Sequence, residues 1–460
     1  MKKIKAGILP HYLELYDKVK SDVRPDMESF LKTVSAEFRK RGVEIIESKI
    51  CRLSGEFEKE IKMLEKSDVQ AIISLHLAYS PSLESAKALA STKLPIVILD
   101  TTPDYEFSPS TDPGRIMFNH GIHGVQDMCN LLIRNGKKFS IETGHWKNSD
   151  VIDRVVSQLR AATAAHSLRN SRTGIIGSPF KGMGDFAVSF DKMKKDIGIN
   201  VIPFDFAKLK TLLPSSDSKD VKDEINSDRK TFKLGTFSSA EHISSTRASI
   251  AVRRWINQNK LNAFSMNFLE SGGRNRLPTV PFLEASKAMS RGIGYAGEGD
   301  VLTASLVGAL LSVYPETTFT EMFCPDWKSN RLFFSHMGEA NIRILKGKAD
   351  LTKCGFPIKD TDTPLFAAGI MKPGRATLIN VAPGRTGYSL IISNVEVKSV
   401  AADKFKGSVR GWISPKTKLE NFLTDYSSAG GTHHLAMVYG DKSNELAKFA
   451  EFVGWKPLMI

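Results

Sequence analysis

The feature that most constrains the fold is an alternation of short apolar runs with amphipathic stretches along the first 170 residues. The apolar runs are rich in Ile and Val, as buried strands are, and the stretches between them repeat apolar residues at helical spacing. This order predicts parallel strands joined by right-handed helical crossovers. The strands are expected at Lys5 to Leu9, Val43 to Ile46, Ala71 to Leu77, Pro95 to Leu99 and Phe139 to Thr143, and the helices at 26–41, 56–66, 83–91 and 151–167.

A second α/β set follows, up to about residue 316. Asp300 suits the N-cap of its last helix because its side chain can accept from a free backbone N–H, and Pro315 lies just past the end of that helix. The polar stretch 214–229 is expected to be a surface connection or an exposed helix. The expected strands are 173–176, 201–204 and 263–268, and the expected helices are 238–258, 281–289 and 300–313. We therefore predict two doubly wound, Rossmann-like parallel-sheet domains.

From about Thr317 the pattern changes to closely spaced strands joined by turns that carry Gly and Pro. Such a run predicts a β-rich, barrel-like domain. The expected strands are 317–323, 332–336, 342–346, 376–381, 389–395, 408–413 and 434–439, before a last helix at 443–453. Because 460 residues exceed what one core supports, we expect three domains, at residues 1–170, 171–316 and 317–460.

The formal net charge of +14 raises the question of a nucleic-acid partner. The basic residues are spread along the chain, acidic residues interrupt most regions, and no RNP-like aromatic motif accompanies them. We therefore expect a solvated basic surface and no nucleic-acid interface. Attraction of an anionic sugar remains an alternative reason for the charge.

The four cysteines are far apart in the chain and form no C-x-x-C pair. This spacing argues against a zinc ribbon and against a disulfide framework, and it suits a reducing compartment. No run approaches the roughly 18 consecutive apolar residues that a membrane-spanning helix needs. We expect a soluble cytoplasmic protein that makes no membrane contact.

Gly292 to Gly297 match the pattern G-x-G-x-x-G. In a dinucleotide-binding fold this pattern follows a strand and opens a helix, so that the pyrophosphate meets the helix N-terminus. Here the glycines follow an expected helix at 282–289 and lie late in the chain. The context argues against a dinucleotide site, and we expect a tight loop that delivers Glu298 and Asp300.

Four side chains that can bind a metal lie where the backbone is constrained. Glu298 stands between two glycines, Glu321 follows a strand-like run with apolar neighbours, His336 ends another apolar run, and His434 follows a Gly-Gly pair. Each residue alone fits a plainer interpretation, because single glutamates usually lie in solvent and single strand histidines are usually satisfied core groups. Only their combination carries a functional prediction.

In combination these motifs resemble the L-arabinose isomerase family. They occur in the order and at the approximate spacing of that family across nearly the whole chain. The matching segments are Gly294 to Asp300, Phe319 to Glu321, Ser335 to Met337 with Glu339, Gly430 to His434, Thr143 to Trp146, Asn119 to Gly124 and Gly182 to Val188.

The resemblance implies a metal site made of Glu298, Glu321, His336 and His434, with both glutamates also acting as acid–base catalysts. Two carboxylates and two imidazoles suit Mn²⁺, with Mg²⁺, Co²⁺ or Fe²⁺ as alternatives. The family is commonly hexameric with shared sites, so we expect a homo-oligomer. The residues that the resemblance places on the sugar are His123, from a segment that reaches a neighbouring subunit's site, and Met183, Phe268, Met337 and His433.

The activity implied is metal-dependent interconversion of an aldose and a ketose. The metal would stabilise an enediolate by gripping two neighbouring sugar oxygens, while one carboxylate moves the carbon-bound proton and the other the hydroxyl proton. By analogy with the family, Glu321 takes the first role and Glu298 the second, and the reverse order stays open. An enediolate also serves a metal-dependent epimerase or aldolase, and the doubly wound domains also suit a non-catalytic sugar-binding protein.

The chain departs from the family pattern around the expected substrate. Loss of polar groups that pair with sugar hydroxyls can change specificity by orders of magnitude. We therefore expect a sugar substrate other than L-arabinose. The departures are Met322 to Trp327 after the second glutamate, Gly338 to Asn341 after the first histidine, Leu9 to Tyr12 in place of a substrate-contacting glutamine, and His120 where a glutamine is usual.

Overall fold

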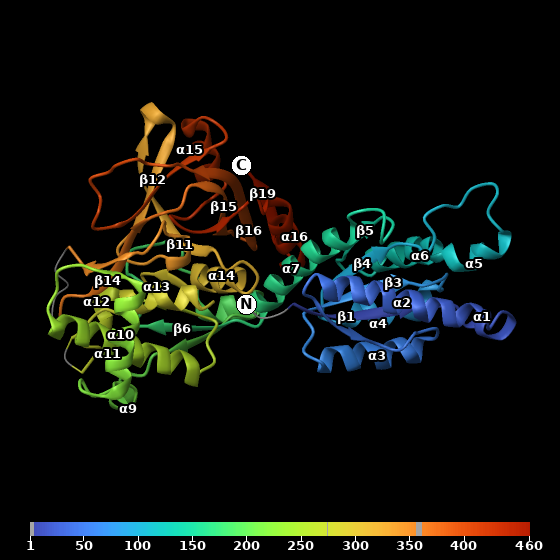
Figure 1. The fold of residues 1–460 in the computed structure, drawn as a ribbon, viewed down its shortest axis with the longest axis horizontal. Helices are drawn as coiled ribbons and strands as arrows, with labels where there is room; N and C mark the ends of the chain where they lie inside the picture. The colour runs from blue at the N-terminus through green and yellow to red at the C-terminus, as the bar shows by residue number, and fades with distance from the viewer. Residues whose placement is uncertain (1–3, 274, 356–360) are drawn as a thin grey trace. The chain divides into compact units, whose positions relative to one another are not determined.

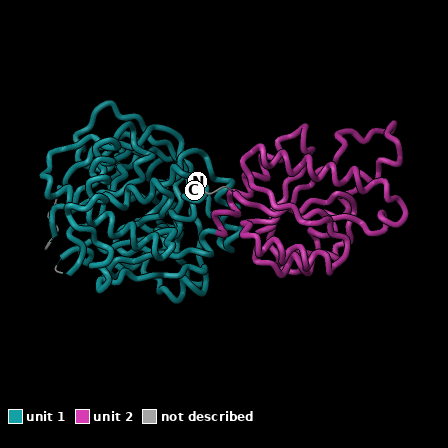
Figure 2. Tube along the Cα trace, turned by 60° about the horizontal axis from the view of Figure 1, so that its bottom comes forward, with its two compact units in different colours: residues 1, 167–460 teal, residues 2–166 magenta. Residues whose placement is uncertain are grey.

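The computed structural model describes residues 4–273, 275–355 and 361–460, which form two compact units. The N-terminal unit comprises residues 2–166 and the C-terminal unit residues 167–460 (Figure 2). Each unit has its own sheets and its own buried side chains. Among the described residues, no helix is both long and apolar enough to cross a membrane.

The N-terminal unit is built on one parallel sheet. Its strands are β1 (Lys5–His11), β2 (Glu44–Glu47), β3 (Ala71–His76), β4 (Ile96–Asp100) and β5 (Ser140–Thr143), and its helices include α2 (Val23–Lys40), α3 (Ser54–Lys66), α4 (Ser82–Ser91), α6 (Gly121–Arg134) and α7 (Val151–Arg169). The strand order is β2-β1-β3-β4-β5, with every neighbouring pair parallel. Apolar residues of α3, α4 and α6 share one core with the sheet (Figure 1). The predicted parallel α/β arrangement is confirmed, and α6 was not predicted.

The C-terminal unit begins with a second parallel sheet, in the order β10-β9-β6-β7. Its strands are β6 (Arg172–Ile176), β7 (Asn200–Pro203), β9 (Ala263–Met266) and β10 (Gly294–Gly297), and its helices include α8 (Phe190–Asp196), α10 (Lys219–Thr231), α11 (Ser239–Gln258), α12 (Phe268–Ser271), α13 (Phe282–Ser290) and α14 (Val301–Leu311). The polar stretch 214–229 contains most of helix α10. The side chain of Asp300 accepts from Thr303 N at 2.9 Å, which confirms the predicted N-cap of α14.

The glycine-rich segment before Glu298 is not the loop that the sequence predicted. Gly294–Gly297 form strand β10, whose residues pair with Ala263–Met266 of β9. A glycine is needed at position 294, because a Cβ there would lie 2.2 Å from the backbone N of Gly308 in α14. Only a glycine therefore lets that helix pack on the strand. The turn between β10 and α14 is therefore confined to residues 298–300.

The rest of the C-terminal unit contains a closed barrel of six strands, as the strand-rich pattern predicted. They are β11 (Thr317–Asp326), β12 (Arg331–His336), β15 (Gly374–Pro383), β16 (Tyr388–Val397), β17 (Val409–Pro415) and β18 (His434–Tyr439). The order is β16-β15-β18-β11-β12-β17, and pairing of β16 with β17 closes the ring. All six pairings are antiparallel. Further elements extend this sheet or cover it: β8 (Lys233–Leu234), β13 (Asp350–Lys353), β14 (Leu365–Ile370), β19 (Lys456–Met459), α15 (Leu419–Ser428) and α16 (Ser443–Val453).

The strand expected at 342–346 is wrong. Ile342–Ile344 form a short 3-10 helix. Asn341 causes the turn, because its side-chain oxygen accepts from Arg343 N at 3.0 Å while its amide donates to the backbone oxygens of Pro315 and Thr317. This capping side chain offers the backbone a local alternative to a strand ladder.

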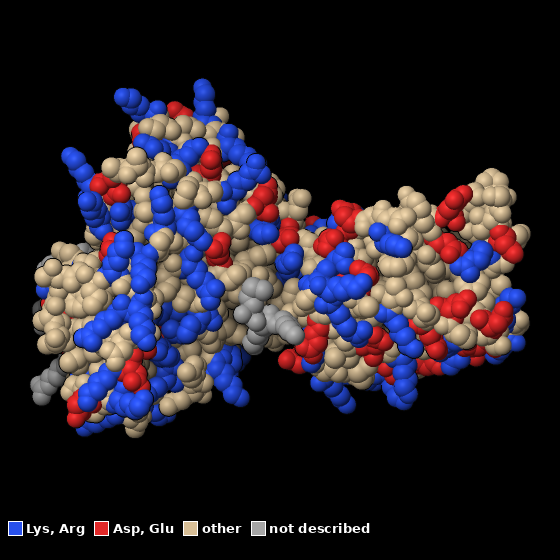
Figure 3. Space-filling view, in the orientation of Figure 1, with Lys and Arg blue, Asp and Glu red and all other residues tan. Residues whose placement is uncertain are grey.

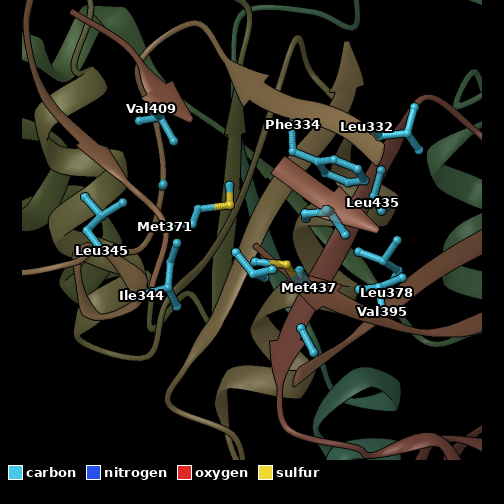
Figure 4. Close-up of a cluster of buried hydrophobic side chains, with 14 of the residues drawn as sticks. Leu332, Phe334, Ile344, Leu345, Met371, Leu378, Val395, Val409, Leu435 and Met437 are labelled. Atoms are coloured by element: carbon cyan, nitrogen blue, oxygen red, sulfur yellow. The ribbon is translucent and has the colours of Figure 1, made fainter. Parts of the chain in front are cut away.

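The barrel core fixes which faces of the strands carry chemistry. Phe334, Leu435 and Met437 are buried in one apolar cluster with residues of neighbouring strands (Figure 4). Burial of such a side chain contributes about 1.5–3 kcal/mol, so the register of these strands is strongly specified. Because side chains alternate along a strand, His434 on β18 points away from the core cluster that holds Leu435.

Candidate metal centre

Four segments of the C-terminal unit bring the predicted metal ligands together. Glu298 lies in the turn after β10, Glu321 on β11, His336 at the end of β12 and His434 at the start of β18. The barrel register places Glu321 directly opposite His434 on one side and opposite Ser335, the neighbour of His336, on the other. Three adjacent strands thus fix three of the four side chains.

The backbone at Glu298 is held in an unusual conformation. Glu298 has a φ of 63°, in the left-handed region that non-glycine residues rarely adopt. Its carbonyl oxygen accepts from the backbone N of Phe180 at 2.9 Å, which ties the turn to a neighbouring loop. A Cβ at Gly297 would lie 2.7 Å from Cε1 of His336, so a glycine is required for that imidazole to approach. The left-handed backbone at Glu298 is strained by about 1–3 kcal/mol, and backbone strain of this kind is typical of functional sites.

The ligand-type atoms form two groups, each compact enough to hold a cation. One set consists of Glu321, His336 and His434, and a second of Glu298, His433 and His434; within each set the atoms lie no more than 4.8 Å apart. Oε2 of Glu298 lies 3.4 Å from Nε2 of His434, and Oε2 of Glu321 lies 3.9 Å from Nε2 of His336. The two sets share His434, so the four predicted ligands belong to two adjoining groups.

Both buried histidines are oriented by a carboxylate on their other ring nitrogen. Nδ1 of His336 lies 2.7 Å from Oε2 of Glu339, and Nδ1 of His434 lies 3.0 Å from Oδ2 of Asp300. Tyr295 donates to the second oxygen of Glu339 at 2.6 Å. Carboxylates in this position fix the tautomer of metal-binding histidines and raise their basicity.

The remaining nitrogens of these two rings have no hydrogen-bond partner among the described residues. Nε2 of His336 and Nε2 of His434 are both buried and unbonded. A buried polar atom without a partner costs about 1–3 kcal/mol. Two such nitrogens beside two glutamates, with nitrogen and oxygen donors facing one another, are the donor set that a divalent transition-metal ion prefers. The residues therefore fit a metal.

The electrostatics of the two glutamates differ. Burial alone would raise the pKa of Glu298, but the imidazoles of His433 and His434 outweigh it and lower that pKa to about 2. For Glu321 burial prevails over the nearby histidines, and its pKa is raised. Burial opposes protonation of His434, yet Asp300 and Glu298 raise its pKa to about 9. Glu298 is thus the carboxylate that stays ionised, and Glu321 is the one that is protonated more readily.

Aromatic rings exclude water from the two buried histidines. The ring of Phe319 packs edge-on against both, with centroids 4.6 Å from His336 and 4.9 Å from His434. Phe186 stacks on His434 at 5.2 Å, with the planes 8° apart. In such low-dielectric surroundings the interaction of a cation with charged ligands is stronger than in water.

The residues predicted to contact the sugar do not all lie beside the predicted metal ligands. His433 lies beside Glu298, with its Nε2 3.6 Å from Oε2. Phe268 packs on Phe180 at 4.9 Å between ring centroids, next to the loop that holds Glu298. Met183 is half-buried and lies two residues before Asp185 in the chain. Met337 is also half-buried and directly follows His336. Their contact with a sugar stays a prediction.

His123 belongs to the N-terminal unit. It is exposed on α6, where its Nδ1 lies 2.5 Å from Nε2 of His120. Its predicted contact with the sugar of a neighbouring subunit stays a prediction.

Sequence reasoning missed the partners of the ligands. Asp300 was expected as an N-cap and as a residue delivered with Glu298 by a loop, and Glu339 only as part of a motif, although each orients a histidine. Their proximity in sequence, two residues after Glu298 and three after His336, could have suggested this role. Asp185, which holds His433, lies in the matching segment Gly182 to Val188, but 248 residues separate the two and no local pattern pairs them.

Comparison with known proteins identifies the family of this chain. Residues 186–314 match the family model of the L-arabinose isomerase central domain, and residues 316–456 match that of the L-arabinose isomerase C-terminal domain. L-arabinose isomerase of Herpetosiphon aurantiacus is 26% identical over 402 residues, which cover 83% of this chain and 78% of that protein. L-arabinose isomerase 2 of Bacillus licheniformis is 22% identical over 86% of this chain and 85% of its own. The resemblance seen in the motifs is confirmed, and this chain belongs to the L-arabinose isomerase family, a family of sugar isomerases that interconvert an aldose and a ketose.

Proposed function

We propose that this protein is a divalent-metal-dependent isomerase that interconverts an aldose and a ketose at the centre formed by Glu298, Glu321, His336 and His434. The observation that carries the proposal is the pair of buried histidines whose Nδ1 atoms are held by carboxylates and whose Nε2 atoms are unbonded beside two glutamates. Mn²⁺ suits this mixed donor set best, with Mg²⁺, Co²⁺ and Fe²⁺ as alternatives.

The two glutamates divide the proton transfers. A bound divalent cation would supply Lewis-acid stabilisation of charge on two adjacent sugar oxygens. Glu321, whose pKa burial raises, takes the proton from one carbon and returns it to the neighbouring carbon. Glu298, whose pKa is held at about 2, starts as the anion that takes the hydroxyl proton from one sugar oxygen and returns it to the other. Environments that separate the pKa values of paired groups support such a division.

The substrate is proposed to be a sugar other than L-arabinose. The segment just past Glu321 is irregular, because the register between β11 and β12 shifts between Met322 and Cys324. Phe323 and Trp327 in this segment are 44% and 58% exposed. The polar residues that the family places here are replaced, and changes among groups that pair with hydroxyls alter specificity strongly.

A homo-oligomer, with His123 supplied to a neighbouring subunit's site, and a cytoplasmic location are also proposed. The family resemblance supports the first. The spacing of the four cysteines, which form no C-x-x-C pair, supports the second, because it suits a reducing compartment.

The decisive experiment follows solvent deuterium into a panel of aldoses and ketoses in the presence of Mn²⁺. NMR of the products should show an aldose–ketose mixture with deuterium on one carbon, and chelation of the metal should stop the exchange. A new stereoisomer would indicate an epimerase and a fragment an aldolase. Sugar binding that is equal with and without Mn²⁺, with no deuterium in any sugar, would establish a non-catalytic binding protein instead.

A further inference from the structure

Three segments leave the same edge of the parallel sheet β10-β9-β6-β7 and contact one another. Residues 177–180 follow β6, residues 267–270 follow β9, and residues 298–300 follow β10. Because these three strands are parallel, their carboxyl ends lie at one edge, where doubly wound folds bind their ligands. Only the last segment contains a predicted metal ligand, Glu298.

Glu270 directs both of its carboxylate oxygens to the segment that follows β6. Its Oε2 accepts from the backbone N of Ser178 at 2.8 Å, and the hydroxyl of Ser178 donates to its two oxygens at 2.9 and 3.0 Å. Asn267 donates its side-chain amide to the carbonyl oxygen of Ser178 at 2.9 Å. Hydrogen bonds to an ionised acceptor are stronger than neutral ones. The peptide groups on both sides of Ser178 are therefore fixed by side chains that follow β9.

The same segment holds the turn that contains Glu298. The backbone N of Phe180 donates to the carbonyl oxygen of Glu298 at 2.9 Å. The turn also packs directly on the segment, because a Cβ at Gly299 would lie 2.5 Å from Cα of Pro179. The carboxylate of Glu270 is thus connected to the backbone of Glu298 through three consecutive residues.

Glu298 needs this support because its backbone is strained. A non-glycine residue with a φ of 63° keeps that conformation only where its surroundings fix it. The bond from Phe180 is made to the carbonyl of the strained residue itself. Release of the segment would let the turn relax and would move the carboxylate of Glu298 away from His434, whose Nε2 lies 3.4 Å from its Oε2.

We propose that Glu270 is a positioning residue, which acts through residues 177–180 to hold the strained turn at Glu298. The inference rests on the proposed function, which gives Glu298 a part in proton transfer, and goes beyond it by assigning a residue outside the predicted metal ligands. The same contacts also place one residue predicted to touch the sugar, because Phe268 stacks on Phe180 with ring centroids 4.9 Å apart.

Hydrogen–deuterium exchange of the metal-free, full-length protein tests this hold without an assay of activity. Glu270→Gln keeps the shape of the side chain and removes its charge. The informative amide is that of Phe180, whose bond to Glu298 does not involve Glu270. Its exchange, measured by mass spectrometry with residue-level fragmentation, should become at least about 10-fold faster.

The matched control is Glu241→Gln in the same unit. Glu241 is also half-buried, and its Oε2 accepts from the backbone N of a serine, Ser238, at 2.6 Å in the capping box of α11. Its substitution removes a bond of the same kind away from the candidate site. It should lower the melting temperature and leave the exchange of the Phe180 amide unchanged.

Activity on the sugar that the panel identifies provides the second measurement. In Glu270→Gln, kcat should fall by about 10- to 100-fold. KM should change little, because a displaced Glu298 affects the transition state more than substrate binding. Ser178→Ala removes only the hydroxyl contacts and should cause a smaller loss. The two losses should not add in the double variant, because both substitutions act on one contact.

Unchanged exchange of the Phe180 amide in Glu270→Gln, or a kcat equal to that of Glu241→Gln, would overturn the inference and leave the proposed function intact. The proposed function fails separately, if the unsubstituted protein with Mn²⁺ puts no solvent deuterium into any aldose or ketose. The exchange measurement would then still decide whether Glu270 holds the turn at Glu298.

Discussion

Each unit contains a pair of adjacent buried histidines, and the two pairs have opposite electrostatic surroundings. In the N-terminal unit His11 and His76 stack at 4.2 Å at the ends of β1 and β3. Burial lowers the pKa of both, that of His76 to about 3. In the C-terminal unit the pair is His336 and His434. His434 is equally buried, but Asp300 and Glu298 raise its pKa to about 9. Burial alone makes a neutral core imidazole, and carboxylates on both sides make a candidate ligand.

The two units also differ in net charge. Residues 167–460 hold 40 of the 64 Lys and Arg and 28 of the 50 Asp and Glu, a net charge of +12, whereas residues 1–166 hold 24 and 22, a net charge of +2. Figure 3 shows basic side chains spread over the visible face of the C-terminal unit. Yet the candidate centre itself gathers carboxylates. The local surroundings of a histidine, and not the charge of its unit, decide what it can bind.

The largest expected effect tests whether the C-terminal surroundings are catalytic. Glu321→Gln removes the group proposed to move the carbon-bound proton, and turnover should fall by about 100- to 10,000-fold. Mn²⁺ should remain bound, although more weakly, because Glu298 and the two histidine ligands are unchanged. Initial rates of aldose–ketose interconversion measure the effect, with Glu420→Gln on α15 as an exposed control. Near-normal turnover in Glu321→Gln would remove Glu321 from the mechanism.

The next effect compares the two histidine pairs directly. His434→Asn should weaken Mn²⁺ binding by more than about 100-fold, because it removes a ligand that Asp300 orients. His76→Asn, at an equally buried histidine of the N-terminal unit, should leave Mn²⁺ affinity unchanged. Isothermal titration calorimetry of both variants provides the measurement. Equal losses in the two variants would contradict the distinction between the pairs.

A smaller effect is expected from crowding one ligand. In Gly297→Ala the new Cβ would lie 2.7 Å from Cε1 of His336 and push that ring away from Glu321. Mn²⁺ affinity should fall by about 10-fold, as when an orienting partner is lost. Gly55→Ala is the control, since nothing lies within 4 Å of a Cβ there and the residue is in helix α3. It should slightly stabilise the protein and keep its metal affinity.

The smallest effect is a pH dependence of stability in the N-terminal unit. The folded-state pKa of His76, about 3, lies below the ordinary value of 6.5, so the unfolded chain binds the proton more readily. The free energy of unfolding is therefore unaffected by this histidine above pH 6.5, and it declines as the pH falls from 6.5 toward 3. Unfolding midpoints at pH 7 and pH 5 should therefore differ less for His76→Phe than for the unsubstituted protein. An identical pH slope would show that His76 is not buried as a neutral ring.

The sequence predicted elements well wherever one periodicity prevailed. The strands and helices that were expected before residue 170 lie within a few residues of their expected bounds, because buried parallel strands give continuous apolar runs. The strand at 342–346 failed since one capping side chain, Asn341, overrode the apolar pattern. Strand β10 was missed because its glycines, which carry no strand propensity, are required by the close approach of α14.

The candidate site was predictable only to the extent that its residues stand in recognisable motifs. Glu298, Glu321, His336 and His434 were identified before the structure, and their roles stay predictions. The partner of His433 was not identifiable, because Asp185 reaches it across 248 residues through packing that no local pattern encodes. A register of strands can be inferred from alternation, whereas a side-chain pair between distant loops depends on the complete fold.

Asp300 uses its two carboxylate oxygens for different purposes. One accepts from Thr303 N and starts helix α14, and the other faces Nδ1 of His434. A substitution there would loosen the first turn of the helix and release the imidazole in a single step. A change at position 300 therefore alters the start of α14 and the orientation of His434 together. Position 300 should tolerate less variation than an ordinary helix cap.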